Sequence, residues 1–253
     1  MKPAAFDLAV PNSISHAAEL LSGAESRAMG GGQSLGPMLN FRAARPATIV
    51  PLTRLEGLRG VEETADAITF GAATTHAEIA DGRTPDLAGA VLARIAAGIA
   101  YRAVRNRGTI GGSLCHADPA ADWLTTLVAL DAVVLTSMRA IGLPHFVTGA
   151  YRTVLESGEI ARAVRVPKPT QGFRWSYCKL CRKPGEFAHA MAAALNTGAG
   201  LRLSIGALGG PPLLLVDERA TLDQAAAALG FMEPVARRIQ LEAVARVLAE
   251  AGA

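Results

Sequence analysis

Residues 105 to 122 read RNRGTIGGSLCHADPAAD, and this stretch carries the strongest indication of both fold and function. It contains two successive glycines, Gly111 and Gly112, with hydroxyl residues on either side. Consecutive glycines let a backbone approach a ligand closely and adopt positive φ, so that several N–H groups can point at one anion. The following acids, Asp118 and Asp122, can accept hydrogen bonds from the hydroxyls of a ribose or ribityl chain. We therefore predict a ligand-binding loop from the start of this stretch to Asp118.

A second glycine stretch lies earlier in the chain, where residues 30–38 read GGGQSLGPM. It follows a predicted strand over 26–29 and precedes a predicted helix, a placement that suits a pyrophosphate, with Ser34 adding a hydroxyl donor. Taken alone, a run of glycines is also typical of an ordinary tight turn. The stretch is not GxGxxG and Pro37 follows closely, so a Rossmann nicotinamide site is not supported. Together, the two stretches could hold a diphosphate from opposite sides.

Hydrophobic spacing and capping signals predict the elements around these stretches. Ser13 offers a helix start, and Thr75 with Glu78 has the spacing of a capping box. The predicted helices cover residues 14–21, 39–42, 86–100 and 123–130, and the predicted strands cover residues 26–29, 48–52, 67–72, 174–178 and 201–208.

A proline-rich stretch from Pro167 to Gly172 is typical of a linker. It predicts one domain over residues 1–167 and a smaller one over 172–253. In the smaller domain we expect strands to alternate with alanine-rich helices. The sequence indicates no role for residues 211–253.

Composition limits the classes of protein that fit. Half of the 253 residues are hydrophobic and 19% are charged, which supplies a sizeable core and predicts an α/β or α+β protein of one or two domains. The net charge is +3 and the isoelectric point about 9.0, but the arginines form no dense run. The local cluster of Arg102, Arg105 and Arg107 lies beside the glycines and suits a small phosphate ligand. Nucleic-acid binding is therefore not expected.

The three cysteines, Cys115, Cys178 and Cys181, argue against a disulfide framework and for a reducing compartment. Cys178 and Cys181 form a CxxC pair, but no second pair exists, so neither a four-thiolate zinc site nor an iron–sulfur cluster is expected. Ser34 and Ser113 lack the context of a nucleophile elbow, which argues against hydrolase chemistry. The remaining histidines outside the glycine stretches are expected to be surface or packing residues: His16, His76, His145 and His189.

No targeting or membrane segment is indicated. The first ten residues contain Lys2 and Asp7 and lack an apolar core of the kind that signal peptides need. The longest apolar stretch, residues 87–100, is interrupted by Arg94 and is too short to span a bilayer. We expect a cytoplasmic protein without a transmembrane segment.

Four stretches together resemble a known family. Residues 30–38 and 105–122 resemble the two FAD loops of the medium subunits of carbon monoxide dehydrogenase and related molybdenum hydroxylases, the xanthine dehydrogenase family. The sequence FGAATTH at 70–76 and the sequence YCKLCRKPGEFA at 177–188 resemble two further segments of that family. The resemblance runs from about Phe6 to Gly210 in the family's order and fades afterwards.

The resemblance implies an α+β fold, in which a two-lobed FAD-binding domain of the vanillyl-alcohol oxidase type precedes a smaller α+β domain. It implies non-covalent FAD, with its pyrophosphate and ribityl chain on the two glycine stretches. It also implies that Ile99 packs near the cofactor and that Lys179 approaches from the C-terminal domain. The expected cofactor-binding residues are Ala28, Met29, Gly30, Gly31, Gly32, Gln33, Ser34, Leu35, Ile99, Thr109, Ile110, Gly111, Gly112, Ser113, His116, Asp118, Asp122 and Lys179.

The function implied is electron transfer, from a [2Fe-2S] subunit to an external acceptor, within a complex that also holds a molybdopterin subunit. Two copies of each of the three subunits are expected by family analogy. No catalytic acid or base can be assigned, and no metal site is expected in this chain. Two alternatives remain open: a stand-alone flavin reductase or oxidase of the same fold, and a degenerate scaffold subunit without FAD. The substrate of the complex and its terminal acceptor cannot be assigned.

Three departures from the family pattern bear on the site. Pro51 stands where the family usually has an acidic residue, and Tyr101 replaces a common histidine. The stretch over residues 136–146 is several residues shorter than usual. The edge of the flavin site is therefore expected to differ from that of other members.

Overall fold

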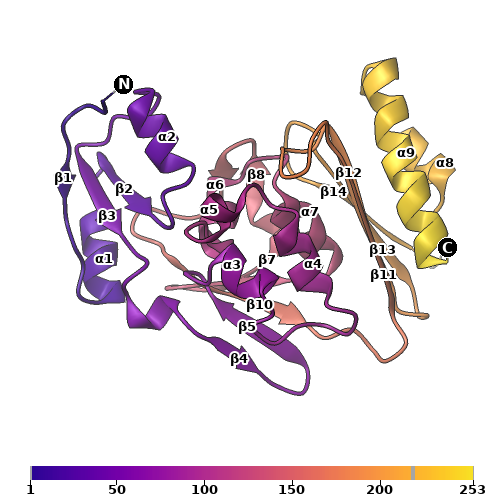
Figure 1. The fold of residues 1–253 in the computed structure, drawn as a ribbon, viewed down its shortest axis with the longest axis horizontal. Helices are drawn as coiled ribbons and strands as arrows, with labels where there is room; N and C mark the ends of the chain where they lie inside the picture. The colour runs from indigo at the N-terminus through magenta and orange to yellow at the C-terminus, as the bar shows by residue number, and fades with distance from the viewer. Residues whose placement is uncertain (1, 218–219, 253) are drawn as a thin grey trace.

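The computed structural model describes residues 2–217 and 220–252. Their three larger β-sheets are arranged along the long axis of the molecule, and a fourth, two-stranded sheet is formed by β8 and β9 of the second lobe (Figure 1). The N-terminal lobe holds a parallel sheet with strand order β1-β3-β2. Its elements are β1 (Asp7–Leu8), α1 (Ile14–Leu21), β2 (Ser26–Met29), α2 (Leu35–Asn40) and β3 (Thr48–Pro51). The β2–α2 connection, at residues 30–34, faces the second lobe.

The two helices of this lobe begin in different ways. The side chain of Ser13 accepts a hydrogen bond from the His16 amide and starts α1, as predicted. The predicted helix over 39–42 is wrong at both ends, because α2 begins at Leu35 and ends at Asn40. Pro37 is tolerated in its first turn since amides there have no partner within the helix.

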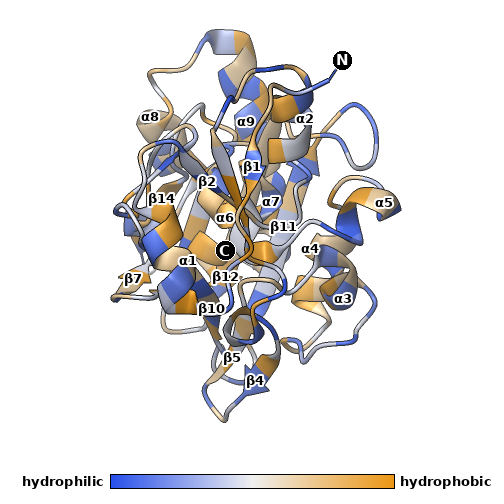
Figure 2. Cartoon of the chain, turned by 90° about the vertical axis from the view of Figure 1, so that its left-hand side faces the viewer, coloured by the Kyte–Doolittle hydropathy of each residue, from blue (hydrophilic) through white to orange (hydrophobic). Residues whose placement is uncertain are grey.

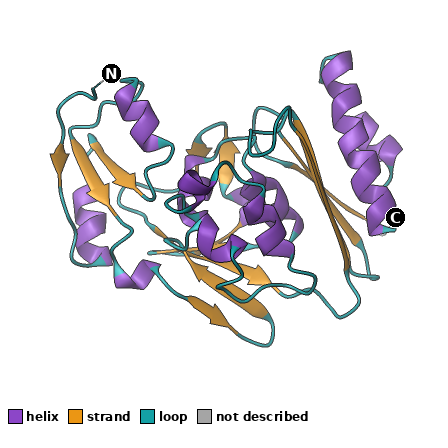
Figure 3. Ribbon diagram, in the orientation of Figure 1, coloured by secondary structure: helices purple, strands orange, loops and turns teal. Residues whose placement is uncertain are grey.

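The second lobe is a five-stranded sheet with order β4-β5-β10-β6-β7, in which every pairing is antiparallel. Helices cover one face of this sheet (Figure 3). Its elements are η1 (Glu56–Leu58), β4 (Val61–Glu63), β5 (Ala67–Gly71), α3 (His76–Ala80), α4 (Val91–Ala97), α5 (Arg102–Arg105), α6 (Ile110–His116), α7 (Asp122–Ala129), β6 (Val133–Thr136), β7 (Ala140–Gly142), η2 (Leu143–His145), β8 (Val147–Gly149), β9 (Arg152–Thr153) and β10 (Ala161–Pro167).

The long helix predicted over 86–100 is wrong, because only Val91–Ala97 is helical. The Asp86 carboxylate accepts hydrogen bonds from the amides of Leu92 and Ala93 at 2.8 Å each, and so caps the helix from outside. Gly89 and Ala90 both have positive φ, so no continuous helix can pass through them.

The C-terminal sheet is antiparallel with order β11-β12-β13-β14 and carries α8 and α9 on one face (Figure 1). Its elements are β11 (Arg174–Leu180), β12 (Ala190–Asn196), β13 (Leu201–Gly206), β14 (Leu213–Asp217), α8 (Leu222–Ala228) and α9 (Pro234–Ala251). The expected alternation of strands and helices is wrong: the strands come first, and the alanine-rich β12 is a strand. It lies between α7 on one face and α9 on the other, where small side chains let both helices approach.

The core consists of three apolar clusters, one at each of the three larger sheets. The largest includes the fully buried Trp123 and Phe70 under the helices of the second lobe. Helices α1 and α3 each carry both hydrophobic and hydrophilic residues, as expected for helices with one face on the core (Figure 2). Secondary structure and layering thus confirm the predicted α+β class.

None of the helices in the described part of the chain combines the length and the apolar character that crossing a membrane requires.

Candidate functional site

The two glycine stretches meet at the junction of the first two lobes. A side chain at Gly31 would lie 1.8 Å from the carbonyl oxygen of Arg107, and one at Gly30 would lie 3.1 Å from Thr109 Oγ1. Contacts this close leave room for backbone only, so the two stretches pack directly on each other. The sequence prediction that they act together is consistent with this placement.

The first stretch presents unused hydrogen-bond donors. Within residues 2–217 and 220–252, the amides of Gly31, Gly32, Gln33 and Ser34 donate to no protein acceptor, although Gly31 is buried. Buried or half-buried N–H groups are rarely left unpaired in folded proteins, so this turn suits a group rich in acceptor oxygens. Gly32 has φ of +71°, which glycine adopts without strain and which bends the donors toward one point. The chemistry of this donor set fits a pyrophosphate.

The second stretch differs from its prediction. Residues 110–116 form α6 rather than a loop, with Thr109 as its N-cap accepting from the Gly112 amide at 3.1 Å. The Ile110 amide donates to Thr74 O and the Gly111 amide to Ala72 O, both at 3.0 Å. The amides of residues 110–112 are therefore used within the protein. Capping explains why a Gly-Gly pair can begin a helix here.

Gly111 has a packing role that the sequence did not indicate. A side chain on it would lie 2.4 Å from Ala72 Cβ and 2.8 Å from Ala72 O. Only glycine allows α6 to lie this close to the segment after β5. The bridge between Thr75 and Thr109 extends this contact between the segment after β5 and the start of α6.

His116 is the last residue of α6, and Asp118 follows its left-handed C-cap Ala117. The His116 ring lies 5.2 Å from the Tyr151 ring, and the Tyr151 hydroxyl is 3.4 Å from Asp118 Oδ2. Burial lowers the pKa of His116, and the Asp118 carboxylate opposes that shift. Sequence reasoning missed Tyr151, which comes from the turn between β8 and β9 and carries no local motif.

Asp122, at the start of α7, pairs with Lys179 from β11. Lys179 Nζ lies 2.9 and 3.0 Å from the two Asp122 oxygens, and the Tyr177 hydroxyl donates to Asp122 Oδ1 at 2.9 Å. The side chains of Asp122 and Lys179 are only 5% and 11% exposed, so the ion pair is nearly dry. Burial raises the pKa of Asp122, against the opposing effects of Lys179 and Tyr177. Burial and the Asp122 carboxylate raise the pKa of Tyr177 well above its usual value, so its hydroxyl remains a donor.

This ion pair borders a cavity of about 420 Å³ between the second lobe and the C-terminal sheet. Lys179 Nζ also donates to Gly98 O at 3.3 Å, and Ile99 forms a bridge with Gly185. The fold thus brings Lys179 and Gly185 against residues 98 and 99 of the second lobe. The cavity is lined by Ala97, Gly98, Ala100, Tyr101, Arg102, Arg105, Lys179, Cys181, Pro184 and Gly185.

The remaining predicted residues flank the glycine turn or support it. Ala28 and Met29 end β2 and pair with Val50 and Pro51, while Leu35 begins α2. His76, predicted to be a packing residue, is buried, and its Nδ1 lies 3.1 Å from Trp123 Nε1. Burial, aided by Arg105, lowers the pKa of His76 to about 4, so the ring is neutral and accepts this hydrogen bond. The described residues contain no cluster of three or more His, Cys, Asp or Glu able to hold a metal ion.

Comparison with known proteins identifies the family. The family described as the FAD binding domain in molybdopterin dehydrogenase matches residues 4–169. The chain belongs to this family. Both the resemblance noted in the sequence and its implied fold are thereby confirmed, and the chain is an oxidoreductase component with an FAD-binding domain.

Relatives of this FAD-binding family cover most of the chain. It is 38% identical over 220 residues to the alpha subunit of the 6-hydroxypseudooxynicotine dehydrogenase complex of Paenarthrobacter nicotinovorans, covering 83% of this chain and 74% of that protein. It is 33% identical over 210 residues to the carbon monoxide dehydrogenase medium chain of Hydrogenophaga pseudoflava, covering 81% and 73%. A solved structure of carbon monoxide dehydrogenase from Hydrogenophaga pseudoflava matches with a TM-score of 0.88 and 28% identity, over 100% of this chain and 99% of the matched chain.

Proposed function

We propose that this chain is the FAD-carrying electron-transfer subunit of a hetero-oligomeric molybdenum hydroxylase. It takes electrons from a [2Fe-2S] subunit and delivers them to an external acceptor. The observation that carries the proposal is the contact between the two glycine stretches, which leaves the donors of Gly31 to Ser34 free at the junction of two lobes. A medium chain and an alpha subunit of dehydrogenase complexes among the relatives support the assembly.

The residues present fit FAD in two regions. Amides of residues 31–34 and the Ser34 hydroxyl would hold the pyrophosphate, with Thr109 to Ser113 supporting the turn from below. The cavity lined by Lys179, next to Ile99, would hold the ring system, and Asp122 would act there through its ion pair with Lys179. Bound FAD accepts electrons singly or in pairs, which couples one-electron clusters to a two-electron acceptor. The buried Asp122–Lys179 pair would fix the C-terminal sheet against the second lobe and exclude water from the ring.

The proposed partners are subunits that carry the iron–sulfur clusters and the molybdopterin. Its three cysteines are free thiols and include no set of four for a cluster, so the [2Fe-2S] clusters and the molybdopterin belong to a small and a large subunit. We place two copies of each subunit in the complex, in the cytoplasm. The chain would divide into an FAD-binding domain over residues 1–167 and a C-terminal domain over 172–253. The terminal acceptor and the substrate remain to be identified by assaying the complex with a panel of each.

We predict that the purified chain is yellow and that acid releases its FAD intact. The site offers hydrogen bonds and charge to the cofactor, and the resemblance implies no covalent link. Acid precipitation followed by chromatography of the supernatant should recover FAD, not FMN, in about equal molar amount to protein. Colour retained in the pellet would show a covalent link, with His116 the first side chain to test. A protein without flavin absorbance would favour the scaffold alternative.

We also predict that the isolated FAD-loaded chain does not oxidise the organic substrate of its complex. No acid–base pair for substrate activation can be assigned near the site, and electrons must come from partner subunits. In the whole complex, removal of FAD should stop transfer to the acceptor while substrate still reduces the iron–sulfur clusters, as seen by electron paramagnetic resonance. Turnover of substrate by the isolated chain at the rate of the complex would instead establish a stand-alone flavoenzyme.

A further inference from the structure

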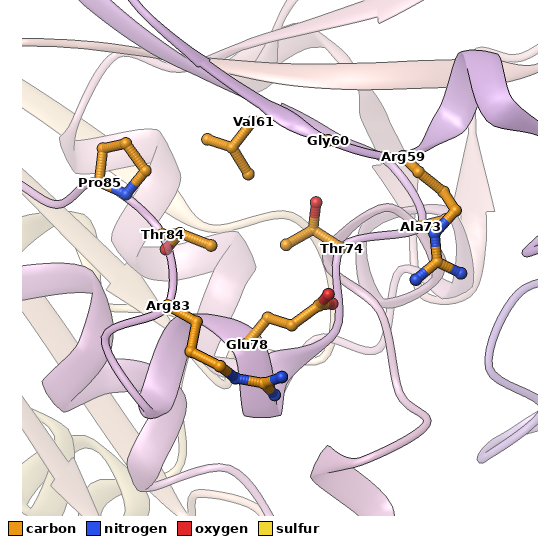
Figure 4. Close-up of a pocket in the computed structure, with 9 residues that line it drawn as sticks. All are labelled: Arg59, Gly60, Val61, Ala73, Thr74, Glu78, Arg83, Thr84 and Pro85. Carbon is orange, nitrogen blue, oxygen red and sulfur yellow. The ribbon is translucent and has the colours of Figure 1, made fainter.

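A second cavity, of about 250 Å³, is lined by none of the predicted cofactor-binding residues. Three segments form it: the link from η1 to β4 with Arg59, the β5–α3 segment with Thr74 and Glu78, and the turn after α3 with Arg83 and Thr84 (Figure 4). These segments are close in space because β4 pairs with β5 and α3 follows β5 directly.

The wall of this cavity contains a hydroxyl that lacks a partner. Thr74 is only 5% exposed, and its Oγ1 makes no hydrogen bond to any residue that the structure describes. A buried hydroxyl without a partner is costly, so proteins seldom leave one unless a water or a ligand completes it. The threonine side chain projects into the space that the other lining residues surround (Figure 4). This hydroxyl therefore keeps its hydrogen-bonding capacity for a polar group that enters the cavity.

The charges around the cavity set the sign of that group. The guanidinium groups of Arg59 and Arg83 lie on the two sides of the Glu78 carboxylate (Figure 4). In the capping box, Glu78 Oε2 accepts hydrogen bonds from the amide and the hydroxyl of Thr75, at 2.7 Å each. Burial alone would raise the pKa of Glu78, but the hydrogen bonds from Thr75 and the two arginines lower it overall, so Glu78 is ionised. Arg83 also lies near Asp81, whose carboxylate is paired with Arg102. Three cations (Arg59, Arg83 and Arg102) and two anions (Glu78 and Asp81) therefore leave an excess of one positive charge.

Both guanidinium groups keep donors for a ligand. Arg59 uses Nη1 to reach the carbonyl of Thr53 at 3.1 Å, and Arg83 Nη2 makes a long contact of 3.5 Å with Asp81 Oδ2. A guanidinium presents five N–H donors, so each arginine has others to offer. Arginine donors and a threonine hydroxyl are the groups that proteins use to bind carboxylates and phosphates.

We propose that this cavity is a binding site for a small oxyanion, a carboxylate or a phosphate, held by Arg59, Arg83 and the Thr74 hydroxyl. The site is separate from the FAD site and does not depend on the proposed function. It shares one wall with it, because Thr74 O accepts the hydrogen bond of the Ile110 amide at 3.0 Å. A bound oxyanion would thus supply the missing hydrogen-bond partner of Thr74, the residue whose carbonyl oxygen helps to hold α6.

The test is calorimetric titration of the full chain, saturated with FAD so that a phosphate ion cannot enter the glycine turn. Inorganic phosphate and acetate are titrated separately against a chloride background of equal ionic strength, and the stronger of the two identifies the source of the oxyanion. We expect saturable binding of at least one. The double variant Arg59→Gln/Arg83→Gln should weaken it at least about tenfold, because charge-assisted hydrogen bonds are lost. Thr74→Val should weaken it without changing the charge.

Arg94→Gln is the matched control, since Arg94 is an exposed arginine on the neighbouring α4 that does not line the cavity. It should bind the oxyanion as the parent protein does. Amide chemical shifts of the parent provide a second measurement that needs no variant, with the largest changes expected at Thr74 and Thr84. Absence of saturable binding, or binding that persists in the double variant, would overturn the proposal. So would shift changes centred on the glycine turn.

Discussion

Gly111→Val is expected to purify without FAD and to unfold at a lower temperature than the parent protein. A β-carbon at this position would lie 2.4 Å from Ala72 Cβ and 2.8 Å from its backbone, so α6 must move away. Overpacking of this kind costs about 1–3 kcal/mol or more. For a chain of this size each kcal/mol corresponds to about 2–4 °C in Tm. Movement of α6 would also displace Thr109, and with it the support of the Gly30–Ser34 turn, so the flavin should be lost.

The measurements are FAD content per chain and Tm by calorimetry. Gly210→Val is the matched control, because a side chain there would meet no atom within 4 Å, and it should keep both values. Cys181→Ser exchanges one sulfur for an oxygen in the wall of the cavity proposed for the flavin ring, without adding volume or charge, so it should keep most of its FAD. Wild-type FAD content in Gly111→Val would contradict the role assigned to α6.

The same glycine shows what sequence could and could not predict. The sequence predicts that Gly111 lets the backbone approach the phosphates of a ligand, and that the two glycine stretches act together. The partner in that approach is Ala72 of the protein, which no spacing in the sequence reveals. The helix over 110–116 was missed because glycine pairs favour turns, whereas here the Thr109 cap and the carbonyls of Ala72 and Thr74 accept its first amides.

Local signals succeeded where one segment decides its own structure. The caps of Ser13 and Thr75 and the strand over 26–29 lie where they were predicted. Local signals failed where tertiary contacts override propensity. The alanines of β12 predict a helix, but the segment is a strand whose small side chains pack between two helices. Pairs distant in sequence, such as Asp122 with Lys179 or His116 with Tyr151, are settled only by the fold.

Lys179→Met is expected to destabilise the protein strongly, because it leaves the Asp122 carboxylate buried without its cation. Removing one partner of a buried ion pair costs about 3–5 kcal/mol. Both side chains here are nearly inaccessible, and Lys179 also spans from β11 to Gly98 O. The loss should be measured as the free energy of unfolding in urea. Because Lys179 borders the cavity proposed for the flavin ring, FAD affinity should fall as well.

Two controls separate charge from packing. Arg246→Met breaks an ion pair with Glu242 whose side chains are 55% and 56% exposed, and it should cost no more than about 1 kcal/mol. The double variant Asp122→Asn/Lys179→Met removes the buried charge together with its partner and should recover most of the stability. Equal losses in the single and double variants would show that Lys179 contributes packing alone.

The pH dependence of the stability of Lys179→Met tests whether the loss comes from the ionised Asp122 carboxylate. Burial already raises the pKa of Asp122 in the parent protein, and loss of the ammonium removes the main group that opposes this shift. A carboxyl whose pKa is higher in the folded than in the unfolded state makes folding less favourable as pH rises above its unfolded pKa. The stability deficit of Lys179→Met should therefore be largest at neutral pH and shrink as the pH is lowered and Asp122 becomes protonated. A deficit that is constant with pH would place the origin of the loss outside the Asp122 carboxylate.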